Sequence, residues 1–160
     1  MSQFISFVYC SSVNLYELIF AFMYDHSDAP IIRVEQMMGI DIPAHLQIST
    51  HDWTKGSQSV TRGYIYSVSD VYFDDTAVEE FEQQLASDEK WLPSVPNALV
   101  GIISSMSNYG SYDYILIYNV DTSEFNTLPR ESGTFRFINI LYSSEDNKMQ
   151  IIEYSIDYAK

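Results

Sequence analysis

The sequence predicts an α+β fold in a single domain, residues 1–160, with one mostly antiparallel sheet and two or three helices packed on it. Three strand-like segments follow one another closely in the last third of the chain, which predicts a C-terminal antiparallel meander. The helical patterns do not alternate regularly with strands, which argues against parallel β-α-β units. A chain of 160 residues with 46% hydrophobic residues is long enough for one core, and no linker composition divides it.

The N-terminal region shows a strand pattern followed by a helix pattern. Residues 3–9 are rich in aromatic and β-branched side chains, which favour a strand. Asn14 and Glu17 have the spacing of a capping box, and the apolar spacing that follows predicts a helix over residues 15–24. Asp28 and Pro30 are expected to end that helical region.

The next segments read mainly as strands. Residues 31–36 and 45–50 are predicted strands, and residues 51–59 are polar and are expected to form a loop. Residues 60–68 alternate between apolar and polar side chains, and this strand is expected to continue to Phe73 after a bend at residues 69–70.

A second helix is predicted from about residue 75 to residue 87. Asp75 and Thr76 are candidate N-caps, and acidic residues in the first turn suit the helix dipole. Residues 88–97 contain two prolines and are expected to form a loop. Residues 98–107 are ambiguous between helix and strand, and a helix is preferred because Asn97 and Gly110 fit its two ends.

The last third gives the clearest pattern. Strands are predicted over residues 113–120, 134–142 and 149–156. The polar connection of residues 143–148 is short enough to join the last two strands as a β-hairpin.

The charge excludes several classes of partner. There are 22 Asp and Glu residues against 8 Lys and Arg residues, a net charge of −14. Nucleic acid and anionic membranes both require basic surface, so neither is an expected partner. The first basic residue is Arg33, and residues 15–24 are too short to span a bilayer, so neither a secretory signal nor a membrane span is expected. We therefore expect a cytoplasmic protein.

Residues that could carry chemistry are sparse. Cys10 is the only cysteine, which excludes an intramolecular disulfide and a cysteine-based zinc site. His26, His45 and His51 show no i+3 or i+4 pairing, so no metal is expected. The sequence also lacks a nucleophile elbow and a glycine-rich phosphate loop, so no cofactor and no enzymatic activity are expected. A small enzyme with a carboxylate-based site stays open as an alternative.

Acidic residues are concentrated in one segment. Eight carboxylates fall within residues 70–89, and that window contains no Lys or Arg. Glu79, Glu80 and Glu82 crowd one polar face of the predicted helix, which costs a few tenths of a kcal/mol per like-charged pair. A plain solvated surface is one interpretation of this segment. The functional interpretation is a docking face for a cationic partner.

Aromatic residues lie near this segment in the sequence. Tyr and Trp are enriched at protein interfaces because they combine a large apolar area with a polar tip. The predicted partner-binding residues are therefore Trp53, Tyr64, Tyr66, Asp70, Tyr72, Asp74, Asp75, Glu79, Glu80 and Glu82.

In overall character, the chain resembles bacterial immunity proteins of contact-dependent growth inhibition. It is small, acidic, rich in tyrosine and free of catalytic motifs. The resemblance implies that the protein binds a toxin domain and blocks its active site. Because nuclease toxins are commonly basic, the expected partner is a cationic toxin with a nuclease domain. The oligomeric state is left open.

The sequence shows one further resemblance, and one other binding hypothesis stays open. Glu35, Gly39 and the Ile42-Pro43 pair are similar to the opening of a second, widespread immunity-protein fold, although residues 50–53 stand where that pattern has an Asn-Gly turn. The other binding hypothesis is an acidic DNA mimic that inhibits a restriction or CRISPR enzyme.

Overall fold

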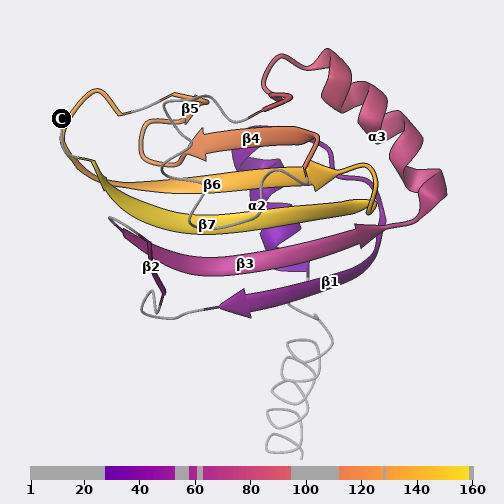
Figure 1. Ribbon diagram of the computed structural model, residues 1–160, viewed down its shortest axis with the longest axis horizontal. Helices are drawn as coiled ribbons and strands as arrows, with labels where there is room; N and C mark the ends of the chain where they lie inside the picture. The colour runs from indigo at the N-terminus through magenta and orange to yellow at the C-terminus, as the bar shows by residue number, and fades with distance from the viewer. Residues whose placement is uncertain (1–27, 53–57, 61–62, 95–111, 128, 159–160) are drawn as a thin grey trace, which may run out of the picture.

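The protein is built around one antiparallel sheet, shown in Figure 1. The computed structural model describes residues 28–52, 58–60, 63–94, 112–127 and 129–158. The predicted strand at residues 3–9, the helix at residues 15–24 and the ambiguous segment at residues 98–107 lie outside these ranges, as do Cys10 and Trp53.

All strand pairs in the described sheet are antiparallel, and the strand order is β1-β3-β7-β6-β4-β5, with β2 pairing with β3. The strands are β1 (His45–Asp52), β2 (Gln58–Val60), β3 (Gly63–Phe73), β4 (Tyr114–Asn119), β5 (Glu124–Phe125), β6 (Gly133–Ser143) and β7 (Lys148–Tyr158). The predicted α+β class is confirmed, and so is the C-terminal meander, in which β6 lies between β4 and β7.

The predicted strand at residues 31–36 is wrong, because these residues belong to helix α2 (Ala29–Met38). Ile31, Val34 and Met38 are buried at helical spacing, and their burial outweighs the small helix penalty of β-branched residues. Pro30 lies in the first turn of α2, where a missing N–H costs nothing, and the helix it was expected to end lies outside the described residues. Gly39 ends α2 in the left-handed conformation at φ 63°.

Helix α3 (Asp75–Ser87) confirms the second predicted helix. Its N-cap is Asp74, one residue before the predicted candidates, and the Asp74 carboxylate accepts hydrogen bonds from the Thr76 N–H at 2.9 Å and the Thr76 hydroxyl at 2.8 Å. Val78, Phe81 and Leu85 form its buried stripe.

The observed strands β1, β2 and β3 have other bounds than the predicted loop at residues 51–59 and the predicted strand at residues 60–68. His51 and Asp52 extend β1 and Gln58–Val60 form β2, so the predicted loop at residues 51–59 is wrong at both of its ends, and its residues 53–57 lie outside the described ranges. β3 runs through the expected bend at residues 69–70 without a break, because it pairs with β1 and β7 on both sides there. Its irregularity is a register shift between Ile65 and Ser67.

Two buried clusters occupy the two faces of the sheet. The first cluster joins α2 and α3 to alternate residues of β3, β4, β6 and β7, such as Val71 and Ile140. In Figure 1, α2 lies behind the sheet and α3 rises beside the ends of β4 and β6. The second cluster includes Ile117, Leu141 and Tyr154 on the opposite face. Burial on both faces explains the almost continuous apolar runs of β4 and β6.

The segment after α3 is attached to the outer edge of β4. Leu92 and Ile115 exchange two backbone hydrogen bonds of 2.8 Å. Asn126, at φ 53°, donates its N–H to the Ile117 carbonyl oxygen, accepts from the Ile117 N–H through its side chain, and donates its amide to the Lys90 carbonyl oxygen. These contacts close the edge of the sheet and fix the C-terminal end of α3.

Candidate functional site

One end of the sheet brings four separate segments together. The Phe73 N–H at the end of β3 donates to the Asn147 carbonyl oxygen at 3.0 Å, and the Asn147 side-chain amide donates to Asp75 at the start of α3. Asp113, just before β4, accepts from the Ser144 N–H at 2.8 Å. The start of α3, the end of β3, the β6–β7 turn and Asp113 therefore form one continuous surface.

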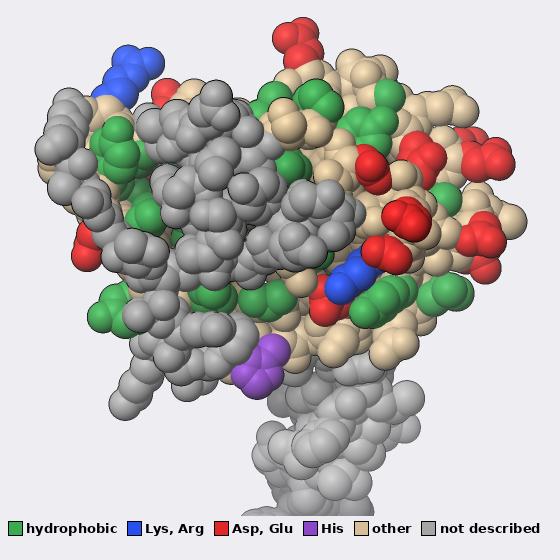
Figure 2. Space-filling view, in the orientation of Figure 1, with side chains coloured by type: hydrophobic (Ala, Val, Ile, Leu, Met, Phe, Trp, Pro, Cys, Tyr) green, Lys and Arg blue, Asp and Glu red, His purple; other side chains and the backbone are tan. Residues whose placement is uncertain are grey.

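This surface, which we call the acidic end, gathers carboxylates from distant parts of the sequence. Its residues are Asp70, Asp74, Asp75, Glu79, Glu80, Glu82, Asp113, Glu145 and Asp146. Figure 2 shows Asp and Glu side chains gathered on the right-hand side of the view, where α3 and the adjacent strand ends lie in Figure 1.

Three of these residues were not among those predicted from the sequence. Asp113, Glu145 and Asp146 lie outside the acidic segment of residues 70–89. The turn between β6 and β7 comes beside α3 because β7 pairs along the whole of β3, and that long-range pairing carries no local sequence signal. The polar character of the predicted hairpin turn was the available hint.

Two carboxylates of the acidic end hold local structure while staying at the surface. Hydrogen bonds from the Thr76 backbone and side chain lower the pKa of Asp74. Hydrogen bonds from the Ser144 hydroxyl and backbone lower the pKa of Asp113 in the same way. Both groups are therefore held in the charged form. Glu79, Glu80, Glu145 and Asp146 are exposed on the same surface.

Asp70 is neutralised by a neighbour. Its carboxylate lies 3.0 Å from the Lys148 ammonium group and accepts from the Gln150 amide at 2.9 Å. Burial opposes the charge of Lys148, but the hydrogen bond with Asp70 leaves the pKa of Lys148 above its ordinary value. The same ammonium group lies 5.5 Å from the centre of the Tyr72 ring. Asp70 and Tyr72 thus form a three-residue unit with Lys148.

Glu82 is also committed to a structural contact. The Tyr142 hydroxyl donates to the Glu82 carboxylate at 3.1 Å, while the Tyr142 side chain is fully buried. Burial, and then the hydrogen bond with Glu82, raise the pKa of Tyr142. Of the predicted partner-binding acids, Glu82 therefore faces the sheet.

Tyr64 and Tyr66 lie far from the acidic end. Tyr66 and Phe73 are seven residues apart along β3, which is roughly 23 Å at the rise of an extended strand. The Tyr66 hydroxyl lies 2.9 Å from the Ser155 hydroxyl. The structure therefore divides the predicted set into the acidic end and a separate pair of tyrosines, with Trp53 outside the described residues.

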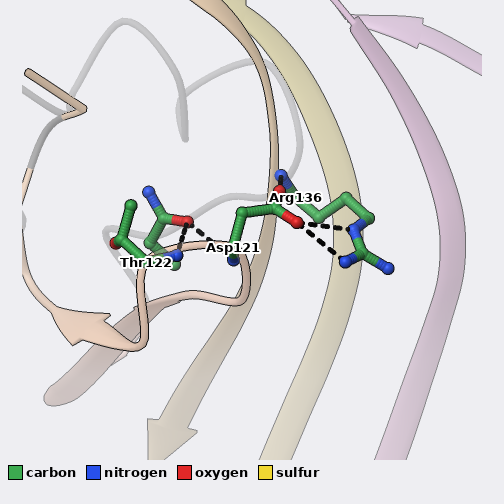
Figure 3. A network of polar contacts seen from close by, with 4 residues as sticks. Asp121, Thr122 and Arg136 are labelled. Carbon is green, nitrogen blue, oxygen red and sulfur yellow. Dashed lines mark hydrogen bonds and ion pairs between the residues drawn. The ribbon is translucent and has the colours of Figure 1, made fainter. Parts of the chain in front are cut away.

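The end of the sheet that carries these tyrosines holds ion pairs. Arg33 of α2 lies 2.6 Å from Glu153 of β7, whose pKa is raised by burial. Arg136 contacts Asp121 through its guanidinium group at 2.7 Å and through its backbone N–H at 2.7 Å, as Figure 3 shows. Among the described residues, two ion pairs thus lie away from the acidic end, while Asp52, Glu124, Glu131 and Asp157 add further carboxylates there that no Lys or Arg pairs with.

A groove borders the acidic end, between α3 and the chain that follows α2. Its first hollow has a volume of about 130 Å³ and its second about 190 Å³, and the two share Asp41, Phe81 and Gln84. The first hollow is also lined by Gly39, Ile40, Leu85, Asp88 and Trp91, and the second by Ile42, Pro43, Ala77 and Glu80. We call this feature the α3 groove.

The wall of the α3 groove opposite the helix is fixed from α2. The Gly39 N–H donates to the Glu35 carbonyl oxygen at 2.9 Å and closes the helix. The Glu35 carboxylate then accepts from the Ile42 N–H at 3.1 Å. The Glu35, Gly39 and Ile42-Pro43 pattern noted in the sequence therefore builds this wall.

Within the described ranges, no three His, Cys, Asp or Glu side chains are placed to hold a metal ion. No helix among the same residues is long and apolar enough to cross a membrane. The chain matches no family model, no curated protein and no solved structure.

Proposed function

We propose that this chain is an immunity protein that binds a cationic toxin domain and blocks its active site, as in contact-dependent growth inhibition. The observation that carries the proposal is the acidic end, where four exposed carboxylates surround the structural ones: Glu79, Glu80, Glu145 and Asp146. The protein acts by binding, catalyses no reaction and works in the cytoplasm, where such a toxin would reach its target.

Electrostatics explain why an inhibitor would concentrate its charge. A one-sided field orients an approaching cationic protein and raises the association rate to about 10⁸–10⁹ M⁻¹s⁻¹ at low salt, against about 10⁵–10⁶ M⁻¹s⁻¹ without steering. Away from the acidic end, Arg33 and Arg136 are matched by Glu153 and Asp121, so these two pairs add little to this field. The proposal is that the clustered carboxylates of the acidic end give the strongest local attraction for a cationic partner.

A nuclease is the toxin class that we propose, because its substrate is a polyanion. A nuclease must hold phosphates with Lys and Arg, and the active site that does so is the most cationic surface it offers. Docking of the acidic end on that surface would exclude the nucleic acid. The DNA-mimic alternative requires carboxylates spread over an extended duplex-like surface. The clustering of Glu79, Glu80, Glu145 and Asp146 around the start of α3 and the β6–β7 turn favours a compact partner site instead.

The test compares two variants with equal loss of charge. The acidic-end variant is Glu79→Gln, Glu80→Gln, Glu145→Gln and Asp146→Asn. The control removes four charges elsewhere, through Asp52→Asn, Glu124→Gln, Glu131→Gln and Asp157→Asn. Each is used as bait in lysate of the native host, and thermal unfolding checks that both retain the fold.

The proposal predicts that wild type and control retain one basic protein, that salt releases it, and that the acidic-end variant fails to retain it. Expression of the captured protein should arrest growth, and co-expression of the wild-type chain should restore growth. Retention that is equal for all three baits, or a captured protein that is harmless, contradicts the proposal.

A further inference from the structure

We propose that the α3 groove is the binding site for an arginine side chain on a segment of the cationic partner. The inference rests on the function proposed above and adds what the acidic end alone does not specify, namely which chemical group is recognised and where. In Figure 1, α3 lies beside the strand ends that carry the acidic end, and residues of α3 line one side of the groove.

The shape of the groove suits one long side chain. A cavity of about 150 Å³ is large enough to hold benzene, and the two hollows of about 130 Å³ and 190 Å³ bracket that size. They adjoin along Phe81 and Gln84, so the groove offers a short channel. A side chain with an extended stem and a compact head fits such a channel.

The lining indicates the chemistry of the head. Asp41 and Glu80 are exposed acidic residues that both line the second hollow, and Gln84, a third lining residue, carries a neutral side-chain amide. Asp88 lines the first hollow, but it already accepts from the Lys90 N–H at 3.0 Å and lies 4.0 Å from the Lys90 ammonium group. Asp41 and Glu80 are therefore the charges that select a cation.

Arginine fits these acceptors better than lysine. A guanidinium group presents five N–H donors in a plane, so it can reach two carboxylates and an amide oxygen together, whereas an ammonium group has three donors on one atom. The floor contains Phe81 and Pro43, and guanidinium groups and their aliphatic stems pack well on such apolar surface.

Contacts on both sides of the groove hold its walls in place, which supports a binding site that is formed before the ligand arrives. Phe81 packs edge-on against Tyr142 and Trp91, with ring centres 5.5 Å and 6.2 Å apart. The Glu35 carboxylate holds the opposite wall through the Ile42 N–H. A preformed groove loses little entropy on binding, so even a short arginine peptide should occupy it.

The test is an NMR titration of the full chain with three blocked peptides, acetyl-Leu-Arg-Leu-amide and its lysine and citrulline analogues. Citrulline keeps the shape of arginine without its charge. The arginine peptide should shift amides of residues 39–42 and 77–91, and it should bind about tenfold more tightly than the citrulline peptide, the effect of losing a charge-assisted hydrogen bond.

Matched variants locate the site. Gln84→Arg places a guanidinium group of the chain itself in the groove and should abolish peptide binding. Gln83→Arg adds the same charge on the neighbouring exposed residue, which lines neither hollow, and should change affinity less than about twofold, as expected for one screened surface charge. Asp41→Asn with Glu80→Gln should weaken binding about tenfold through the loss of both charged acceptors.

Several results overturn the inference: no binding of the arginine peptide, shifts centred on Asp113, Glu145 and Asp146 and absent from residues 39–42, equal effects of Gln84→Arg and Gln83→Arg, or tighter binding of spermidine than of the peptide. Failure of the proposed function is distinguishable from these. If the proposed function is wrong, the wild-type bait retains no cationic protein. If only the groove proposal is wrong, the bait still retains the cationic protein, the acidic-end variant loses it, and the Gln84→Arg variant retains it as wild type does.

Discussion

The Tyr142 hydroxyl and the Glu82 carboxylate are joined by a 3.1 Å hydrogen bond that links α3 to the end of the inner strand β6. The two residues are 60 positions apart in the sequence, and the Tyr142 ring also contacts Phe73, Phe81 and Tyr114. This contact helps to position the helix that carries Asp75, Glu79, Glu80 and Glu82 of the acidic end.

A double-mutant cycle should measure this link. We expect Tyr142→Phe and Glu82→Ala each to lower the free energy of unfolding by about 1 kcal/mol, with a coupling of about 0.5–1 kcal/mol between them. Glu82→Gln keeps an acceptor for the hydroxyl and should cost less. Urea denaturation at neutral pH gives all four values. Strict additivity of the two single variants would show that the hydrogen bond contributes nothing.

High pH should act on the same contact. Because the pKa of Tyr142 is raised in the folded chain, the folded state holds the phenol proton more tightly than the unfolded state above about pH 10. Stability is therefore complete below pH 10 and falls as the pH rises beyond it. Unfolding free energies measured from pH 8 to pH 11 should fall more steeply for wild type than for Tyr142→Phe. Parallel curves for the two proteins would refute this.

Gly63 should tolerate no side chain. A Cβ atom at this position would lie 1.8 Å from the Ser155 carbonyl oxygen, which is backbone and cannot rotate away. We expect Gly63→Ala to lower the free energy of unfolding by about 1–3 kcal/mol, as other overpacking substitutions do. A useful comparison is Gly39→Asn, since Gly39 has open space and a left-handed φ that Asn accepts. The expectation fails if thermal unfolding shows Gly63→Ala to be the milder change.

Asn126 should be the main support of the β4 edge. Its side chain accepts from the Ile117 N–H at 3.1 Å and donates to the Lys90 carbonyl oxygen at 2.7 Å. Asn126→Ala removes both bonds and should cost about 2 kcal/mol, whereas Asn126→Asp keeps the acceptor and should cost less. Hydrogen exchange at the Ile117 amide should quicken in Asn126→Ala. Unchanged exchange there would mean that the side chain does not protect this edge.

Local patterns were enough to predict α3 and the C-terminal meander. The buried stripe of Val78, Phe81 and Leu85 repeats at helical spacing, and strands β4, β6 and β7 stand close together in the sequence. Helix α2 was missed because Ile31 and Val34 favour strands by type, while their spacing fits one helix face. In a segment this short, the two signals compete, and only packing against the sheet decides between them.

The candidate site was predictable only where it is local. The cluster on α3 is visible in the sequence, but the neutralisation of Asp70 by Lys148 depends on the pairing of β3 with β7. The same pairing brings Glu145 and Asp146 to the acidic end and separates Tyr64 and Tyr66 from it. The α3 groove depends on α2 ending at Gly39, which the predicted strand obscured.

The most direct measurement is the association rate of the chain with the toxin domain captured by wild type, followed by stopped flow from low to high salt. Steering by the acidic end predicts a wild-type rate that falls steeply with salt. At low salt, the association rate of wild type should be about tenfold or more above the association rate of the acidic-end variant. The association rate of the matched control should stay close to that of wild type. A rate that is indifferent to salt and equal for all three proteins would contradict the role of the acidic end.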